Sequence, residues 1–375
     1  LFTLAFLEGG IVMCIELLGA RFLAPVYGSS LEVWSIVLAM SVGALTLGYF
    51  VGGFFSQKNN KSLLLHLLLV SAGILILLMP ILAKLTIKDF NPQNLIFDCL
   101  VATLVFIAPP LFLLGSTTPI IIELKSNSIE ESGKAAGNVY GISTIGGIFF
   151  TYLTGFYLIP QHGLTTTTIV AAVVIASIPF FILIKEKKYI ALILVPVFVL
   201  SFFNMNTVSS TSPDVKVLHY SEGMLGQLLL VDLETKYDTF SIKDRVVYVN
   251  RIGQTWVNAE TGDSRWDYPN FLVSIASTLK PNPNVLVLGL GGGTVPRYFE
   301  SILNAKVEAV EIDSRMESIA KQYFSLGNTK VHINDARHFI ETTYNKYDFK
   351  EELDSEHQDV DLKNIDELIK EVVSF

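Results

Sequence analysis

Four glycines and one glutamate form the strongest chemical motif of this chain. Gly289, Gly291, Gly292 and Gly293 close one apolar stretch, and Glu311 ends the next one, twenty residues after Gly291. Glycine has no Cβ atom, so a ligand can lie directly against the backbone of such a turn. A carboxylate at this distance can accept hydrogen bonds from both hydroxyls of a ribose. The motif predicts a nucleoside site, and a tight turn without a ligand is the alternative.

A motif of this kind has to lie between a buried strand and a helix. Short apolar stretches alternate with amphipathic ones through the same region. The predicted strands are 285–289, 306–313 and 330–334, and the predicted helices are 265–279, 296–303, 315–323 and 336–343. This alternation predicts a doubly wound α/β (Rossmann, methyltransferase-like) domain with parallel strands.

A different pattern precedes this region. Polar and apolar residues alternate in short runs, which predicts a small antiparallel β-sheet. The predicted strands are 215–219, 226–233, 239–242 and 246–250. Turns are predicted at 221–223 and at 243–244.

The first half of the chain is too apolar for an ordinary soluble enzyme. The 375 residues are 51% hydrophobic, and the apolar ones concentrate before about residue 205. About twenty apolar residues suffice to cross a bilayer. We therefore predict an α-helical multi-pass membrane bundle of about seven spans, near 2–25, 33–56, 62–84, 95–123, 136–160, 164–184 and 189–205. The whole chain then divides into a transmembrane domain (1–205), a small β subdomain (206–255) and a nucleoside-binding domain (256–375).

Net charge and cysteine content limit which partners and cross-links the chain is expected to have. A net charge of −8 and a pI of 5.3 argue against nucleic acid. Cys14 and Cys99 both lie in apolar segments, which predicts no disulfide framework. The histidines lack metal-binding spacing, so no metal is predicted. A lipid bilayer is the partner that the composition favours.

Three charged residues, Glu8, Glu16 and Arg21, stand in the first predicted span. Glu16 and Arg21 are five residues apart, and charges inside a span usually face a partner or a cavity. One interpretation is a polar site in the bundle. The other is that Arg21 reaches the interface while Glu16 forms a structural bond to another helix.

The side of the membrane is indicated in two conflicting ways. Lysines concentrate in alternate loops, which predicts a cytoplasmic N-terminus and, after seven crossings, an outward soluble domain. Nucleoside cofactors are made in the cytosol, which favours a cytoplasmic soluble domain. We expect a multi-pass cell-membrane protein with its soluble domain in the cytoplasm, against the loop charges.

From 220 to 348 the chain resembles the spermidine synthase (polyamine aminopropyltransferase) family, a relative of the nucleoside-dependent methyltransferases. The matching residues are Ser221-Glu222, Gln227, Asn250 through Gln254, Asp267-Tyr268, the glycine turn, 310–313 and Asn334-Asp335-Ala336. The first half also looks like the multi-pass segment fused to some of these synthases, through Glu16, Arg21, 28–30, 137–140 and 144–147.

The resemblance implies a site for an S-adenosyl nucleoside, either S-adenosylmethionine or its decarboxylated form, and no metal. Glu311 would hold the ribose, and Asp335, followed by Ala336, would accept a hydrogen bond from the adenine amino group. Gln227 would lie against the nucleoside, and Tyr268 would line the pocket of the attacking amine. The implied substrate is a polyamine or another small amine, and a homodimer is the assembly considered.

Three departures from the family pattern bear on catalysis. Thr294 stands where the family has an aspartate that neutralises the aminopropyl ammonium. A strand ending in the catalytic aspartate should follow Asp348, but 349–361 is acidic and has no buried-strand pattern, and 362–373 reads as an amphipathic helix. The Rossmann-like domain therefore looks truncated, which leaves Asp348 and Tyr268 as catalytic candidates.

These observations support three classes of function. The first is a membrane-anchored transferase, with aminopropyl transfer preferred and methyl transfer as the alternative. The second is a polyamine or cation transporter or sensor with a non-catalytic nucleoside-binding domain. The third is a structural protein without catalysis.

Overall fold

The protein is described here from a computed structural model, which covers residues 1–87, 94–126, 128, 131–204, 213–223, 225–237, 240–278 and 281–348. The predicted features at 349–361 and 362–373 lie outside these residues. The chain forms two compact units. The first comprises Leu1–Ser209, His219–Leu229 and Val249–Arg251, and the second comprises Ser210–Leu218, Leu230–Tyr248 and Ile252–Phe375.

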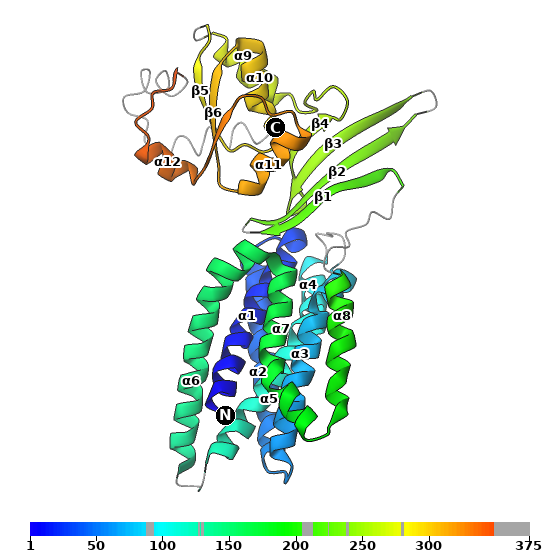
Figure 1. The fold of residues 1–375 in the computed structure, drawn as a ribbon, viewed down its shortest axis with the longest axis vertical. Helices are drawn as coiled ribbons and strands as arrows, with labels where there is room; N and C mark the ends of the chain where they lie inside the picture. The colour runs from blue at the N-terminus through cyan, green and yellow to red at the C-terminus, as the bar shows by residue number, and fades with distance from the viewer. Residues whose placement is uncertain are drawn as a thin grey trace. The chain divides into compact units, whose positions relative to one another are not determined.

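The first unit is built mainly from helices that run roughly parallel to one another (Figure 1). Its helices are α1 (Phe2–Tyr27), α2 (Leu31–Ser56), α3 (Lys61–Thr86), α4 (Leu95–Phe106), α5 (Ala108–Lys125), α6 (Ser132–Leu153), α7 (Ile159–Lys185) and α8 (Leu194–Asn204). A π-helical turn, Thr154–Leu158, joins α6 to α7, and a 3-10 turn, Tyr189–Ile193, precedes α8. The most extensive contacts between helices join α1 to α6, α2 to α5, and α3 to α7.

Fewer membrane spans are found than the sequence predicted. Within the described residues, four stretches of helix are long and apolar enough to cross a membrane, or five if the bent pair α4–α5 is one span. All seven predicted segments are helical, but α8 is short. The segments 136–160 and 164–184 belong to one stretch of 54 residues, Ser132–Lys185. Fewer stretches pass this criterion than the seven predicted, and the number of spans stays a prediction.

The long stretch is not straight. A straight helix of that length would measure about 80 Å, more than twice the apolar thickness of a bilayer. Gly163 interrupts it with φ 77° and ψ 179°, a conformation open to glycine because it has no Cβ. Figure 1 shows α6 and α7 as separate columns that both run along the bundle.

A carboxylate from the sheet caps the helical arm that restarts after Gly163. Glu222 Oε2 accepts from the backbone N of Thr165 at 2.8 Å, and Glu222 Oε1 accepts from the Thr165 hydroxyl at 3.1 Å. The hydroxyl of Tyr220 also donates to Glu222, at 2.8 Å. An acid at a helix start satisfies free N–H groups and interacts favourably with the helix dipole. All of these residues belong to the first unit.

A four-stranded sheet follows the helices, with strands in chain order: β1 (Val215–Gly223), β2 (Gly226–Lys236), β3 (Ser241–Val249) and β4 (Ile252–Asn258). Asn250 and Arg251 join β3 to β4 with φ of 48° and 66°. Two consecutive residues with positive φ form the turn that matches the twist of an antiparallel hairpin. The small antiparallel sheet was thus predicted correctly.

The strand boundaries within this sheet were predicted incorrectly. One strand, β3, covers most of the described residues of the predicted strands 239–242 and 246–250, and the predicted turn at 243–244 lies inside it. Asp244 suggested a turn, but its carboxylate accepts hydrogen bonds from Trp256 Nε1 at 3.0 Å and from Arg265 Nη2 at 2.7 Å. These tertiary partners stabilise an acidic side chain in the middle of a strand. The fourth strand, β4, was missed.

Three parallel strands form a second sheet in the order β5 (Asn284–Leu288), β6 (Lys306–Glu311) and β7 (Lys330–Ile333). The helices between them are α10 (Thr294–Leu303) and α11 (Ser314–Tyr323), with α9 (Tyr268–Ala276) before the sheet and α12 (Ala336–Thr342) after it. Val273 and Ala276 of α9 pack with Tyr298 and Phe299 of α10 in one buried cluster. These elements match the predicted alternation, while a complete doubly wound fold stays a prediction.

Candidate nucleoside site

The glycine turn lies at the carboxyl end of β5, as the motif requires. Gly289, Gly291 and Gly293 have φ of 90°, 53° and 79°, values that residues with a Cβ rarely adopt. The N–H of Gly289 donates to the carbonyl of Val310 on β6 at 2.8 Å. A Cβ placed on Gly289 would meet no heavy atom within 4 Å, so this face of the turn is open.

Glu311 is held against the same turn. Its side chain is 8% exposed, and Oε2 accepts from the backbone N of Leu290 at 2.9 Å. Its other oxygen, Oε1, accepts from the backbone N of Asp313 at 2.9 Å. An ionised carboxylate has about four acceptor positions, so two backbone bonds leave room for two more donors. This geometry suits a carboxylate that accepts hydrogen bonds from a pair of ribose hydroxyls.

Thr255 also positions the turn, although no sequence pattern marked it as a site residue. Its hydroxyl oxygen accepts from the backbone N–H of Gly292 at 2.7 Å, and its O–H donates to the carbonyl oxygen of Gln254 at 2.7 Å. Thr255 lies on β4 and is 5% exposed. A Cβ on Gly292 would lie 2.8 Å from Thr255 Cγ2. Because Gly292 has no side chain, Thr255 of β4 can pack directly against the backbone of the turn.

The end of β7 lies beside the end of β6. The backbone N of Asn334 donates to the carbonyl of Glu311 at 3.0 Å. Asp335 follows and caps α12, accepting from the backbone N of His338 through Oδ1 at 3.0 Å. Ala336 is the first residue of α12. Because Asp335 is exposed and uses one oxygen for the cap, its other oxygen is available to a ligand in this region.

The remaining predicted site residues lie on other elements of the chain. Tyr268 begins α9 and lies 6.0 Å from Trp266, ring centre to ring centre, and burial raises the pKa of its hydroxyl. Gln227 lies on β2 in the first unit, where its backbone N donates to Asn250 Oδ1 at 3.0 Å. Asp348 Oδ2 accepts from the backbone N of Asn284 at 2.6 Å. That contact is at the amino end of β5, opposite the glycine turn.

The position expected to carry an acid beside the turn is occupied by Thr294. It begins α10 and is 6% exposed. The structure therefore brings together the glycines, Glu311, Asp335 and Ala336, and it places Asp348 at the other end of the sheet. No group of three metal-binding side chains occurs within the described residues.

Glu16 and Arg21, the two candidates for a polar site in the bundle, differ in exposure. Glu16 is half-buried on α1 and Arg21 is exposed, and the structure records no salt bridge between these two described residues. The fully buried carboxylate of α1 is Glu8, at 3% exposure.

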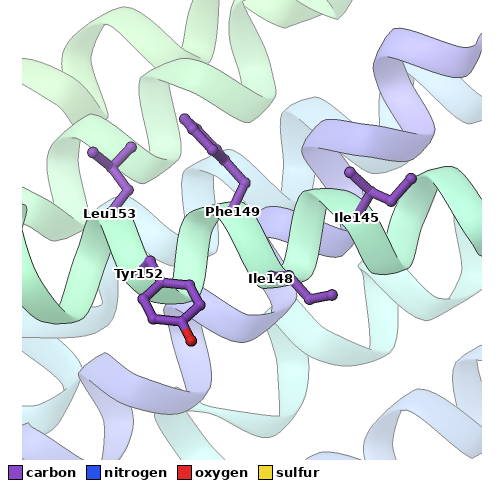
Figure 2. A pocket seen from close by; sticks show the side chains of 5 residues that line it. All are labelled: Ile145, Ile148, Phe149, Tyr152 and Leu153. Carbon is purple, nitrogen blue, oxygen red and sulfur yellow. The ribbon is translucent and has the colours of Figure 1, made fainter.

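A separate apolar groove lies on α6. Ile145, Ile148, Phe149, Tyr152 and Leu153 line it, as Figure 2 shows. All five side chains come from one helix, α6, and the lining is apolar except for the hydroxyl of Tyr152.

Two curated proteins are similar to parts of the chain. A polyamine aminopropyltransferase of Vibrio vulnificus is 35% identical over 105 residues, which is 26% of this chain and 35% of that protein. An eEF1A lysine and N-terminal methyltransferase homolog of Drosophila pseudoobscura pseudoobscura is 38% identical over 89 residues, 21% of this chain and 13% of that protein. The matches thus span about a third or less of these relatives.

No family profile matches the chain. No solved structure matches it either. The similarity supports a relationship to the spermidine synthases and methyltransferases.

Proposed function

We propose that this chain is a membrane-anchored transferase that binds an S-adenosyl nucleoside, and that it transfers an aminopropyl group to a polyamine or similar amine. The observation that carries the proposal is Glu311, a nearly buried carboxylate fixed beside an open glycine turn. The similarity to a polyamine aminopropyltransferase supports the choice of reaction. The apolar helices support the membrane anchor.

Different residues would bind different parts of the nucleoside. Glu311 would accept from the ribose hydroxyls, and Asp335 would accept from the adenine amino group. The donor supplies a carbon activated by a neighbouring sulfonium. The uncharged amine nitrogen attacks that carbon, a C–N bond forms, the C–S bond breaks, and its electron pair stays on sulfur. Positioning and removal of the amine proton are the contributions left to the protein.

Methyl transfer is the second candidate because of Thr294. An aminopropyl donor carries an ammonium group without a neighbouring carboxylate. An acidic side chain at position 294 would therefore favour binding of that donor by neutralising its ammonium. Thr294 supplies no charge there, and the similarity to a methyltransferase homolog points the same way. Titration of the purified chain with S-adenosylmethionine and with its decarboxylated form separates the two. Tighter binding of the decarboxylated nucleoside supports aminopropyl transfer, and the reverse supports methyl transfer.

The nucleoside site itself is tested by Glu311→Gln. The amide can no longer accept at both positions, so we expect affinity for the preferred nucleoside to fall by about 1.5–3 kcal/mol. Glu341→Gln, an exposed carboxylate on α12, is the matched control and should leave affinity unchanged. Equal affinity of the wild type and Glu311→Gln in calorimetric titration would remove the proposed site.

Turnover is expected to be weak compared with binding. Asp348 is at the amino end of β5, away from the turn, and Thr294 replaces an acid. We therefore expect little product from a polyamine acceptor assay in which the nucleoside is bound. Rapid spermidine formation would show that another carboxylate of the chain takes the proton.

A further inference from the structure

The carboxyl group of Glu8 is enclosed by three helices of the first unit. Thr118 of α5 donates its hydroxyl to Glu8 Oε1 at 3.2 Å. Ser143 of α6 donates its hydroxyl to Glu8 Oε2 at 3.0 Å. Glu8 is 3% exposed and Thr118 is 2% exposed. The carboxyl group therefore has one hydroxyl partner on each oxygen and almost no access to solvent or lipid.

No basic side chain neutralises Glu8 among the described residues, since both of its hydrogen-bond donors are hydroxyls. Two lysines of the first unit, on α3 and on α5, have other partners. Lys61 pairs with Glu123 at 2.9 Å, and Lys125 lies over the ring of Phe2, 4.5 Å from its centre. An isolated ion in apolar surroundings is strongly disfavoured, and an ionisable group inside a membrane span is a candidate functional site.

The helices around Glu8 are too close together to hold a large ligand. A Cβ on Gly9 would lie 2.2 Å from the carbonyl oxygen of Ser143, and one on Gly146 would lie 2.0 Å from that of Phe6. On the neighbouring pair of helices, a Cβ on Gly52 would lie 2.3 Å from the carbonyl oxygen of Ser116. Backbones in direct contact leave space for a proton, while an organic cation or a hydrated metal ion would have to separate the helices.

We propose that Glu8, with Thr118 and Ser143, is an exchangeable proton-binding site within the membrane bundle. A hydroxyl can both donate and accept a hydrogen bond. When the carboxyl is ionised, both hydroxyls donate to it. When it holds a proton, its O–H donates to one hydroxyl oxygen and the other hydroxyl still donates. The site thus satisfies both forms without a change of helix position, and the helical half has a chemical role separate from nucleoside binding.

Other titratable groups lie within electrostatic range. Tyr49 of α2 interacts with Glu8, with Glu16 of α1 and with Tyr140 of α6. These groups are polar but none carries a positive charge, so they do not neutralise an ionised Glu8. A purely structural role is the competing explanation, in which Glu8 only joins α1 to α5 and α6. Glutamine would serve that role as well as glutamate.

Infrared spectroscopy of the full chain in detergent, recorded across a pH titration, tests the proposal. We expect a carbonyl band of a buried carboxylic acid whose intensity changes with pH. Glu8→Gln should abolish this band while preserving the helical spectrum. Glu123→Gln, which removes a more exposed carboxylate of α5, is the matched control and should keep the band.

A second variant covers the case in which Glu8→Gln does not fold. Thr118→Val retains the carboxyl group but removes one hydroxyl, so the band should shift in frequency. The proposal is overturned by a band that is absent throughout the titration, that survives in Glu8→Gln, or that is unmoved by Thr118→Val. Nucleoside binding is measured in the same samples, and it should be unchanged in all of these variants.

Discussion

At the scale of single residues, the candidate site depends on side chains that bind backbone N–H groups. Glu311 binds the N–H groups of Leu290 and Asp313, and Thr255 binds that of Gly292. A glycine-rich turn has many accessible conformations in the unfolded chain, so its order has to come from neighbouring groups. Glu311 therefore serves the shape of the turn in addition to its proposed contact with a ribose.

Thr255→Val tests this role of neighbouring groups. Valine has nearly the same shape but no oxygen, so the buried N–H of Gly292 loses its acceptor. We expect a loss of about 1–3 kcal/mol in stability, together with weaker nucleoside binding. Thr235→Val, at an exposed position on β2, is the control. Unchanged thermal unfolding and unchanged affinity of Thr255→Val would show that the turn is ordered without this bond.

The pH dependence of the second unit should reflect Glu308. His332 Nε2 lies 2.7 Å from Glu308 Oε2, and the hydroxyl of Tyr347 donates to the same oxygen at 3.1 Å. Burial alone would raise the pKa of Glu308, but these two bonds and the charge of Lys330 lower it below 4.5. A lowered folded-state pKa stabilises the protein above pH 4.5, and this stabilisation is lost as the pH falls through the folded value.

Glu308→Gln should abolish that acid-dependent loss. We expect wild type to unfold at lower temperature below pH 4.5, and the variant to show a smaller decrease over the same range. Trp256 and Trp266 in this unit provide the fluorescence signal for the measurement. Parallel curves for the two proteins would exclude a titrating contribution from Glu308.

At the scale of elements, the break at Gly163 and the cap by Glu222 act together. The positive φ of Gly163 turns the chain, and a Cβ there would lie 2.5 Å from Glu222 Cβ. The glycine thus permits both the bend and the approach of β1. The helical arm after the bend begins with unpaired N–H groups, and Glu222 satisfies one of them.

Glu222→Ala should destabilise this junction by about 1–3 kcal/mol, because Thr165 and Tyr220 would lose their shared acceptor. The measurement is thermal unfolding of the full chain in detergent. Glu260→Ala, an exposed glutamate, should have little effect. Equal melting temperatures for Glu222→Ala and Glu260→Ala would mean that the cap adds no stability.

At the scale of the whole molecule, the surface of the helices is apolar, whereas the surface of the sheets carries charged residues. Large apolar side chains are exposed on the helices, among them Phe50, Phe54, Phe156 and Phe181, each more than 60% exposed. Soluble proteins rarely expose apolar surface over so many neighbouring helices. Several charged residues of the sheets form ion pairs, such as Arg245 with Asp232 at 2.7 Å. One half thus suits lipid and the other suits water.

The membrane assignment is tested by expressing residues 1–205 alone. We expect this fragment to remain in the membrane pellet after alkaline carbonate extraction and to require detergent for release. Recovery in the carbonate supernatant would contradict a membrane bundle and would make the apolar helices the core of a soluble assembly.

The sequence by itself determined the features that depend on local pattern. Apolar runs predicted the helices of the first half, and the strand–glycine–helix alternation predicted β5, α10, β6, α11, β7 and α12 to within a few residues. Hydrophobic periodicity and glycine content act over short distances along the chain, so they can be read without tertiary contacts.

Only the tertiary structure decided which residues meet. Thr255 lies 37 residues before Gly292, and Glu8 lies 110 residues before Thr118, distances over which no local pattern operates. Asp244 was taken for a turn residue because its partners, Trp256 and Arg265, come from later segments. Asp348 follows the last helix of the alternation, but the structure puts its carboxylate at the amino end of β5. Such contacts depend on packing energies between distant segments, and these become visible only when the chain is folded.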